Sequence, residues 1–101
     1  MSVLVVLRIA ADAEGVKRAT EENHETFLAI AERAKGRGAI HHAFYSGDGE
    51  VLVVDEWDSA ESFQSFFQDE SPNIGPLMAA GGAQGEPEPR FYEKLMLGDE
   101  F

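Results

Sequence analysis

The chain has 101 residues, 44% of them hydrophobic and 27% charged, which predicts a single globular domain over residues 1–101. Nineteen acidic residues against eight basic ones give a formal charge of −11, so we expect no binding to nucleic acid or to an anionic membrane. The chain has no cysteine, which excludes disulfides, thiolate metal sites and a cysteine nucleophile and fits a cytoplasmic location.

The first predicted elements are a strand and a long helix. Residues 2–10 are apolar and rich in β-branched side chains, which predicts a strand, and the run is too short to cross a membrane. No basic residue precedes this run and Arg8 interrupts it, so we expect no secretory signal. From Asp12 to Ala34 the apolar residues recur at helical spacing, which predicts one helix with Asp12 as its N-cap and Gly36 as its stop.

Two strands and the start of a second helix follow. Residues 39–46 and 50–57 each predict a strand, and the sequence GDG at 47–49 predicts a tight turn between them. Asp58 is followed three residues later by Glu61, which is the capping-box pattern that opens a helix.

The second helix presents three phenylalanines within residues 63–67 at helical spacing. We expect it to weaken near Ser71-Pro72 and to be followed by a further short turn at 76–80. The glycines and prolines of residues 81–89 predict a loop, and residues 90–97 predict the last strand.

The order strand, helix, strand, strand, helix, strand is that of the ferredoxin-like split βαβ plan. The fold class is therefore predicted as α+β, with a four-stranded antiparallel sheet that carries both helices on one face.

Strands one and three are apolar on both faces. In the first strand, Val3, Val5 and Leu7 alternate with Leu4 and Val6, whereas a solvated face would show alternating polar residues. Leaving five or six such side chains in water costs about 1.5–3 kcal/mol each, a large part of the roughly 5–15 kcal/mol that holds a domain folded. We therefore predict a homodimer in which a second sheet covers this face through a two-fold contact.

The segment VLVVDEWDSAESFQSFFQ at 51–68 resembles the signature of the antibiotic biosynthesis monooxygenase-like family. In that family an apolar strand ends in an acid, any residue and a tryptophan, which are matched here by Asp55 and Trp57. A serine-led helix with an aromatic stripe follows, matched by Ser59 and by Phe63, Phe66 and Phe67.

The resemblance implies a dimeric α/β barrel with a pocket in each subunit between helices and sheet. The family includes cofactor-independent oxygenases that act on polycyclic phenols, and haem-degrading enzymes. The haem-degrading branch uses an asparagine on strand one, a tryptophan in helix two and a histidine soon after. Here strand one has no asparagine, helix two offers Phe66 or Phe67, and no histidine follows Tyr45, so the comparison points away from haem.

Asn23 and His24 are the candidate catalytic residues. Asn23 lies in the apolar stripe of the first helix, where a buried amide needs hydrogen-bond partners, and it would orient a ligand carbonyl or phenolate. The alternative is an amide satisfied by backbone or water. His24 would act as a base near neutral pH, and its alternative is a solvated histidine at the edge of the stripe.

His41 and His42 are adjacent in a strand and face opposite ways, so they cannot share one ion, and no metal site is predicted. His42 shares a face with Phe44, and His41 shares the other with Tyr45; the sequence leaves open which face lines the pocket. The predicted ligand-binding residues are His42, Tyr45, Trp57, Phe63, Phe67 and Tyr92, and the alternative for the aromatic ones is a place in the core.

The resulting functional hypothesis is a monooxygenase-like protein that uses no cofactor and acts on a small hydrophobic molecule, phenolic or polyketide-like. His24 would remove a proton from a phenol or quinol, the anion would itself reduce oxygen, and Asn23 or a tyrosine would hold the oxygen anion. One alternative is a non-enzymatic homodimer that binds a small ligand or accompanies an enzyme. Another is isomerisation or cyclisation of a polyketide.

Overall fold

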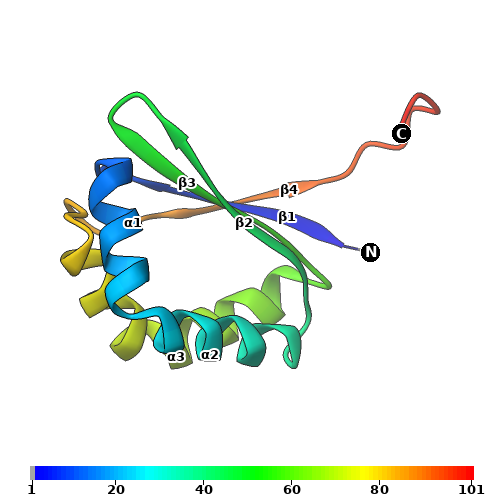
Figure 1. The fold of residues 1–101 in the computed structure, drawn as a ribbon. Coiled ribbons are helices and arrows are strands. Elements are labelled where there is room, and N and C mark those ends of the chain that lie inside the picture. The colour runs from blue at the N-terminus through cyan, green and yellow to red at the C-terminus, as the bar shows by residue number, and fades with distance from the viewer. Residues whose placement is uncertain (1) are drawn as a thin grey trace.

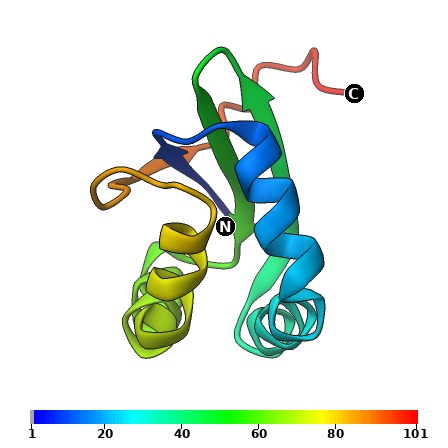
Figure 2. The ribbon, with the colours of Figure 1, turned by 60° about the vertical axis from the view of Figure 1, so that its left-hand side comes forward.

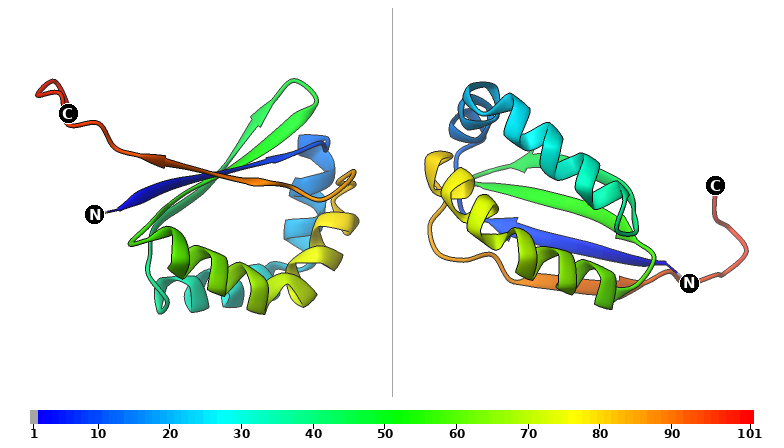
Figure 3. Two further views of the ribbon diagram at one scale, coloured as in Figure 1. Left: turned by 180° about the vertical axis from the view of Figure 1, so that it is seen from behind. Right: turned by 90° about the horizontal axis from the view of Figure 1, so that it is seen from below.

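The computed structural model describes residues 2–101. Its elements, in chain order, are β1 (Val3–Ile9), α1 (Ala13–Glu22), α2 (His24–Lys35), β2 (Ala39–Gly47), β3 (Glu50–Trp57), α3 (Ala60–Ala80) and β4 (Pro89–Glu93). The strands form one antiparallel sheet in the order β2-β3-β1-β4. All three helices cover the same face of this sheet (Figures 1 and 3). The predicted α+β, ferredoxin-like arrangement is confirmed.

The hydrophobic core lies between the sheet and the helices. Val5 on β1 faces Asp55 on β3 and Phe91 on β4, so these three residues share the helix-facing side of the sheet. Figure 2 shows α2 and α3 nearly end-on beneath that side. The buried core consists mainly of Val5, Leu7, Ile9, Val51, Val53, Trp57, Phe63 and Phe66. No helix within residues 2–101 is both long and apolar enough to cross a membrane.

The first helical segment is broken, so the prediction of one helix from Asp12 to Ala34 is wrong. The first helix ends at Glu22, the second begins at His24, and Asn23 between them has φ −124° and ψ 35°. The amide Nδ2 of Asn23 donates to the Ala19 carbonyl at 2.9 Å, beside the backbone N–H of Asn23, which donates to the same oxygen at 3.0 Å. Asparagine side chains compete in this way with the helical hydrogen-bond ladder, and α1 turns away from α2 at this residue (Figure 1).

The third helix is more continuous than predicted. The sequence predicts weakening near Ser71-Pro72, but α3 continues through both Pro72 and Pro76. Pro72 has no N–H to donate to the Gln68 carbonyl, but the Ser71 hydroxyl donates to that oxygen at 3.1 Å. Ser59, rather than Asp58, is the N-cap, since its Oγ accepts from the backbone N–H of Ser62 at 3.1 Å.

The last strand is shorter than predicted. It ends at Glu93 rather than at residue 97. Glu93 lies opposite Val3, where β1 begins, so the residues that follow have no strand of their own chain beside them. Residues 94–101, named here the tail, leave the sheet and project away from the body of the molecule (Figure 1).

An ion pair joins α2 to α3 at the edge of the core. Arg33 Nε and Nη2 donate to the two carboxylate oxygens of Glu70 at 2.5 and 2.9 Å, and Asn73 Nδ2 donates to Glu70 Oε1 at 3.0 Å. Glu70 is only 6% exposed. The hydrogen bonds from Arg33 and then Asn73 lower the pKa of Glu70 to about 2, against the opposing effect of burial.

We expect Glu70→Gln to lower the free energy of unfolding at pH 7 by about 1–2 kcal/mol, less than for a fully buried pair because the Arg33 side chain is 48% exposed. The folded-state pKa lies below that of an unfolded glutamate, so the carboxylate stabilises the fold fully above about pH 4.5, and this is lost as the pH falls toward 2. Urea unfolding at several pH values should therefore show a flatter curve between pH 2 and 4.5 for the variant. Glu86→Gln, at an exposed loop position, is the control and should retain the wild-type curve.

Candidate functional site

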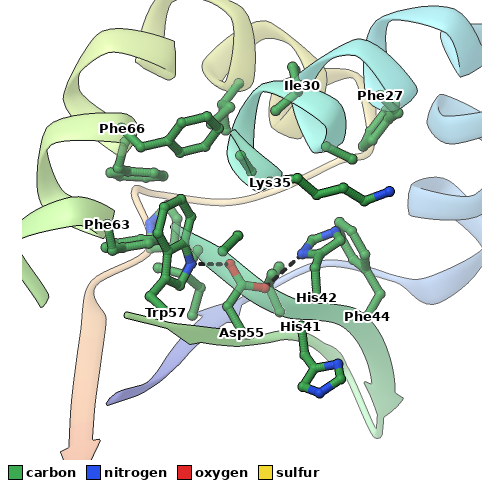
Figure 4. Close-up of a pocket in the computed structure, with 18 of the residues that line it drawn as sticks. Phe27, Ile30, Lys35, His41, His42, Phe44, Asp55, Trp57, Phe63 and Phe66 are labelled. Carbon is green, nitrogen blue, oxygen red and sulfur yellow. Dashed lines mark hydrogen bonds and ion pairs between the residues drawn. The ribbon is translucent and has the colours of Figure 1, made fainter. Parts of the chain in front are cut away.

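A cavity of about 380 Å³ lies between the helix-facing side of the sheet and helices α2 and α3 (Figure 4). Most of its lining is apolar and aromatic, as is typical of sites for small hydrophobic molecules. Prominent lining residues are Leu7, Ile30, Phe44, Phe63, Phe66 and Leu77.

Two polar side chains meet on the sheet wall of this cavity. His42 on β2 and Asp55 on β3 are direct cross-strand partners, and Nδ1 of His42 lies 2.7 Å from Oδ1 of Asp55. The second oxygen of Asp55 accepts from Nε1 of Trp57 at 3.1 Å. Asp55 and Trp57 are two residues apart in one strand, so both project to the cavity side. Asp55 is 8% exposed, and each of its oxygens has a hydrogen-bond partner.

The arrangement defines which nitrogen of His42 is free to react. The Asp55 carboxylate accepts a hydrogen bond from Nδ1–H, which leaves Nε2 as the unprotonated nitrogen of the neutral ring. In Figure 4 the edge of the ring far from Asp55 turns toward the helix side of the sheet. The ring is packed edge-on against Phe44 at 5.3 Å between centroids, and Phe44 in turn contacts Phe27 at 6.4 Å. An imidazole oriented by a carboxylate in an apolar cavity has the geometry of a general base.

A second aromatic group packs beside Trp57. The indole contacts Phe63 at 5.5 Å and Phe66 at 5.2 Å between ring centroids, and Phe63 stacks on Phe67 at 5.4 Å. These rings close the cavity on the α3 side, so Trp57 both fills the core and holds Asp55.

Four of the predicted ligand-binding residues line the cavity: His42, Trp57, Phe63 and Phe67. Tyr45 and Tyr92 do not; they lie opposite Leu52 and Leu4, on the face without helices, and are 57% and 50% exposed. The face of β2 that carries His42 and Phe44 is therefore the one that lines the cavity. His41 contributes to the cavity edge, but its ring points to the other side of the sheet (Figure 4).

Asn23 and His24 lie at the junction of α1 and α2, and neither is among the residues that line the cavity. The Asn23 amide is occupied by the Ala19 carbonyl, and His24 is exposed. Their catalytic roles stay predictions, and the structure brings His42 and Asp55 to the cavity in their place.

The pairing of His42 with Asp55 has a signal in the sequence. The two-residue turn Asp48–Gly49, with Gly49 at φ 73°, sets Gly47 opposite Glu50. Counting outward from that pair places His42 opposite Asp55. An aspartate at an inward position of a buried strand also needs a partner.

Metal ligands are a separate question. Within residues 2–101, no group of three histidine, aspartate or glutamate side chains is placed to hold an ion.

Comparison with known proteins gives matches in structure but none in sequence. No protein-family model matches the sequence, and no curated protein sequence does. SnoaB, a cofactor-independent oxygenase from Streptomyces nogalater, is similar with a TM-score of 0.60 and 16% identity over 98% of each chain. An antibiotic biosynthesis monooxygenase is similar with a TM-score of 0.64 and 9% identity, over 92% of this chain and 98% of that one.

A dimeric ferredoxin-like protein from an uncultured marine organism has a TM-score of 0.66 and 13% identity, over 94% of this chain and 91% of its own. The chain has the fold of these oxygenase-like, ferredoxin-like proteins. The resemblance read from residues 51–68 is thus confirmed for the fold. At these identities the likeness concerns architecture alone.

Proposed function

We propose that this protein is a cofactor-independent oxygenase for a small hydrophobic molecule that carries an acidic hydroxyl group. The observation that carries the proposal is the 2.7 Å contact between His42 and Asp55 on the wall of an apolar cavity. The structural likeness to SnoaB supports the reaction class.

The first step of the proposed reaction is a proton transfer. The substrate hydroxyl gives its proton to Nε2 of His42, and the Asp55 carboxylate stabilises the imidazolium that forms. Lys35 also lines the cavity, but its side chain is 70% exposed and its ammonium bonds Glu32 at 3.0 Å, so the His42 imidazolium is the positive charge beside the resulting oxyanion.

The second step uses the electron-rich anion as the reductant of O2. A CH2 group in a ring of the substrate is converted to C=O. One oxygen atom of O2 enters the product, and the other leaves with two protons as water. The substrate supplies all four electrons, so the step needs no other reductant. His42 returns its proton during the loss of water. The protein contributes orientation, charge stabilisation and an apolar enclosure.

We also propose that the protein acts as a homodimer formed by the sheet face without helices. That face exposes Leu4, Tyr45 and Tyr92. Its charged residues are Arg8, Glu50, Glu56 and Arg90, which sum to zero in a chain of net charge −11, so two such faces can approach without the repulsion expected elsewhere. The dimeric state named for one structural neighbour supports this assembly.

The reaction can be tested with a hydroxyanthrone, which carries both a phenol and an oxidisable CH2 group. Protein treated with a chelator and freed of flavin should consume O2 and release the quinone at a rate well above the protein-free oxidation. Product formation should stop under argon. Binding of the hydroxyanthrone, seen as a thermal shift without O2 uptake above background, would contradict the proposal and favour a non-enzymatic ligand-binding dimer.

A further inference from the structure

The indole of Trp57 is linked to the ring of His42 through the carboxylate of Asp55. Nε1 of Trp57 donates to Oδ2 of Asp55 at 3.1 Å, and Oδ1 of the same carboxylate lies 2.7 Å from Nδ1 of His42. Figure 4 shows both contacts on the sheet wall of the cavity. An indole has one N–H and no acceptor, so the direction of its hydrogen bond is fixed. The two hydrogen bonds therefore run in series from the indole to the proposed base.

Trp57 is the most firmly held of these three residues. It is 1% exposed, whereas Asp55 is 8% exposed and the side chain of His42 is 42% exposed. Its backbone lies in β3 between Val3 of β1 and Ala39 of β2. Two phenylalanine rings of α3 pack on its indole, at 5.5 and 5.2 Å between centroids. The indole N–H is thus a fixed point from which the two more exposed side chains can be oriented.

Asp55 depends on this donor. At 8% exposure the carboxylate has little access to water, and leaving one of its oxygens without a donor is costly. Among residues 2–101, Nε1 of Trp57 is the one donor within hydrogen-bond distance of Oδ2. The bond to Oδ2 holds the plane of the carboxylate, which keeps Oδ1 directed at Nδ1 of His42. Without this bond we expect the carboxylate to turn toward another donor.

We infer that the indole N–H of Trp57 fixes the tautomer of His42 through Asp55, which makes Trp57 a positioning residue for the proposed base. The hydrogen bond made by one ring nitrogen decides which nitrogen of a neutral histidine carries the proton. With Oδ1 directed at Nδ1, the proton lies on Nδ1 and Nε2 is left free. When Asp55 turns away, part of the His42 population carries its proton on Nε2 and cannot accept another proton there.

The effect on rate rests on the proposed function, but the effect on the tautomer requires no reaction. The two effects can therefore be measured separately, on the free protein and on the protein with substrate.

The test removes the N–H and keeps the fused rings. Because the chain has one tryptophan, an analogue introduced at position 57 by codon suppression replaces the sole indole of the protein. Benzothienylalanine has sulfur in place of the indole N–H, so it removes the donor and retains the packing. Fluorotryptophan keeps the N–H and is the matched control. Circular dichroism and thermal unfolding verify that both proteins fold.

Long-range ¹H–¹⁵N NMR of the histidine rings reports the tautomer directly. Spectra are recorded at a pH where histidine is neutral, and His42→Gln identifies the signals of His42 among the three histidines. We expect the proton of His42 on Nδ1 in the wild-type and fluorotryptophan proteins. In the benzothienylalanine protein the fraction protonated on Nε2 should rise several-fold. A residue that only fills the core would not produce this change.

The kinetic measurement uses the hydroxyanthrone as substrate. In the benzothienylalanine protein kcat should fall about 10–100-fold, the scale expected for a misplaced catalytic group, with KM changed less than about twofold. Trp57→Phe also lacks the donor and should show the same change of tautomer. It provides a second measurement if the benzothienylalanine protein folds poorly.

The outcomes separate this inference from the proposed function. If the benzothienylalanine and Trp57→Phe proteins both keep the proton of His42 on Nδ1, the inference is overturned, whatever their rates. If the tautomer changes as expected but the wild-type protein consumes no O2 above background, the proposed oxygenase function fails and the role of Trp57 in fixing the tautomer stands.

Discussion

Replacing His42 with alanine should lower kcat for the hydroxyanthrone about 10²–10⁴-fold, the range for removal of a general base. The reason is that Nε2 of His42 is the proposed acceptor for the substrate proton, and the ring is held in place by the 2.7 Å contact to Asp55. Stopped-flow or steady-state O2 uptake measures the effect. Because the side chain is 42% exposed, we expect the fold to survive, which circular dichroism would verify.

Three further variants make this experiment decisive. Asp55→Asn would present an amide N–H to Nδ1 and favour the tautomer with a proton on Nε2, so it should also lose activity. Asn23→Ala and His24→Ala, at the junction of α1 and α2, should keep most of the wild-type rate. Loss of turnover in the His24 variant with full turnover in the His42 variant would instead support the base predicted from sequence.

Replacing Trp57 with alanine should lower the free energy of unfolding by about 3–5 kcal/mol, the usual cost of deleting a buried large aromatic side chain. Trp57 is 1% exposed and packs against Phe63 and Phe66, so its removal leaves unfilled space in the core beside the existing cavity. The loss is a large share of the total stability of a typical domain. Urea unfolding followed by circular dichroism is the measurement.

The matched control is Trp57→Phe, which keeps an aromatic ring in the core and removes the N–H that bonds Asp55 Oδ2 at 3.1 Å. We expect a smaller loss, about 1–3 kcal/mol, from a buried carboxylate oxygen left without its donor. Equal losses in the two variants would show that the hydrogen bond to Asp55, rather than packing, dominates the role of Trp57.

The order of the elements was predictable because each strand is a short apolar run bounded by turn residues. The Asp48–Gly49 turn joins β2 and β3 as a hairpin, and residues 50–57, although apolar on both faces in the sequence, bury every second side chain in the structure. The interruption of the first helix was not predictable from periodicity, because the apolar stripe continues through Asn23 without a break. The interruption comes instead with a side-chain hydrogen bond, in which the Asn23 amide donates to the Ala19 carbonyl. The continuity of α3 through Pro72 and Pro76 was likewise not visible in the sequence pattern; at Pro72 the Ser71 hydroxyl donates to the Gln68 carbonyl, which a proline cannot do.

The site was predictable only in part. Aromatic spacing identified the residues of α3 that line the cavity, since they must face the sheet. Asn23 and His24 were proposed from a stripe assumed to be one straight helix, and the break places them away from the sheet wall. The role of Asp55 depends on a cross-strand neighbour, which periodicity along one strand does not contain.

The Asp48–Gly49 turn lies at the far end of the hairpin from Asp55 and does not line the cavity, yet the register that it sets decides which side of β2 faces the cavity. One added or deleted turn residue would swap the two sides of β2, sending His42 outward and His41 inward, unless a bulge absorbed the change. Descendants of this protein can therefore lengthen the hairpin in steps of two residues and keep the acid–imidazole couple. Insertion of an odd number of residues would keep the fold but turn the His42 ring away from the cavity. The length of this hairpin therefore restricts how the protein can change in evolution.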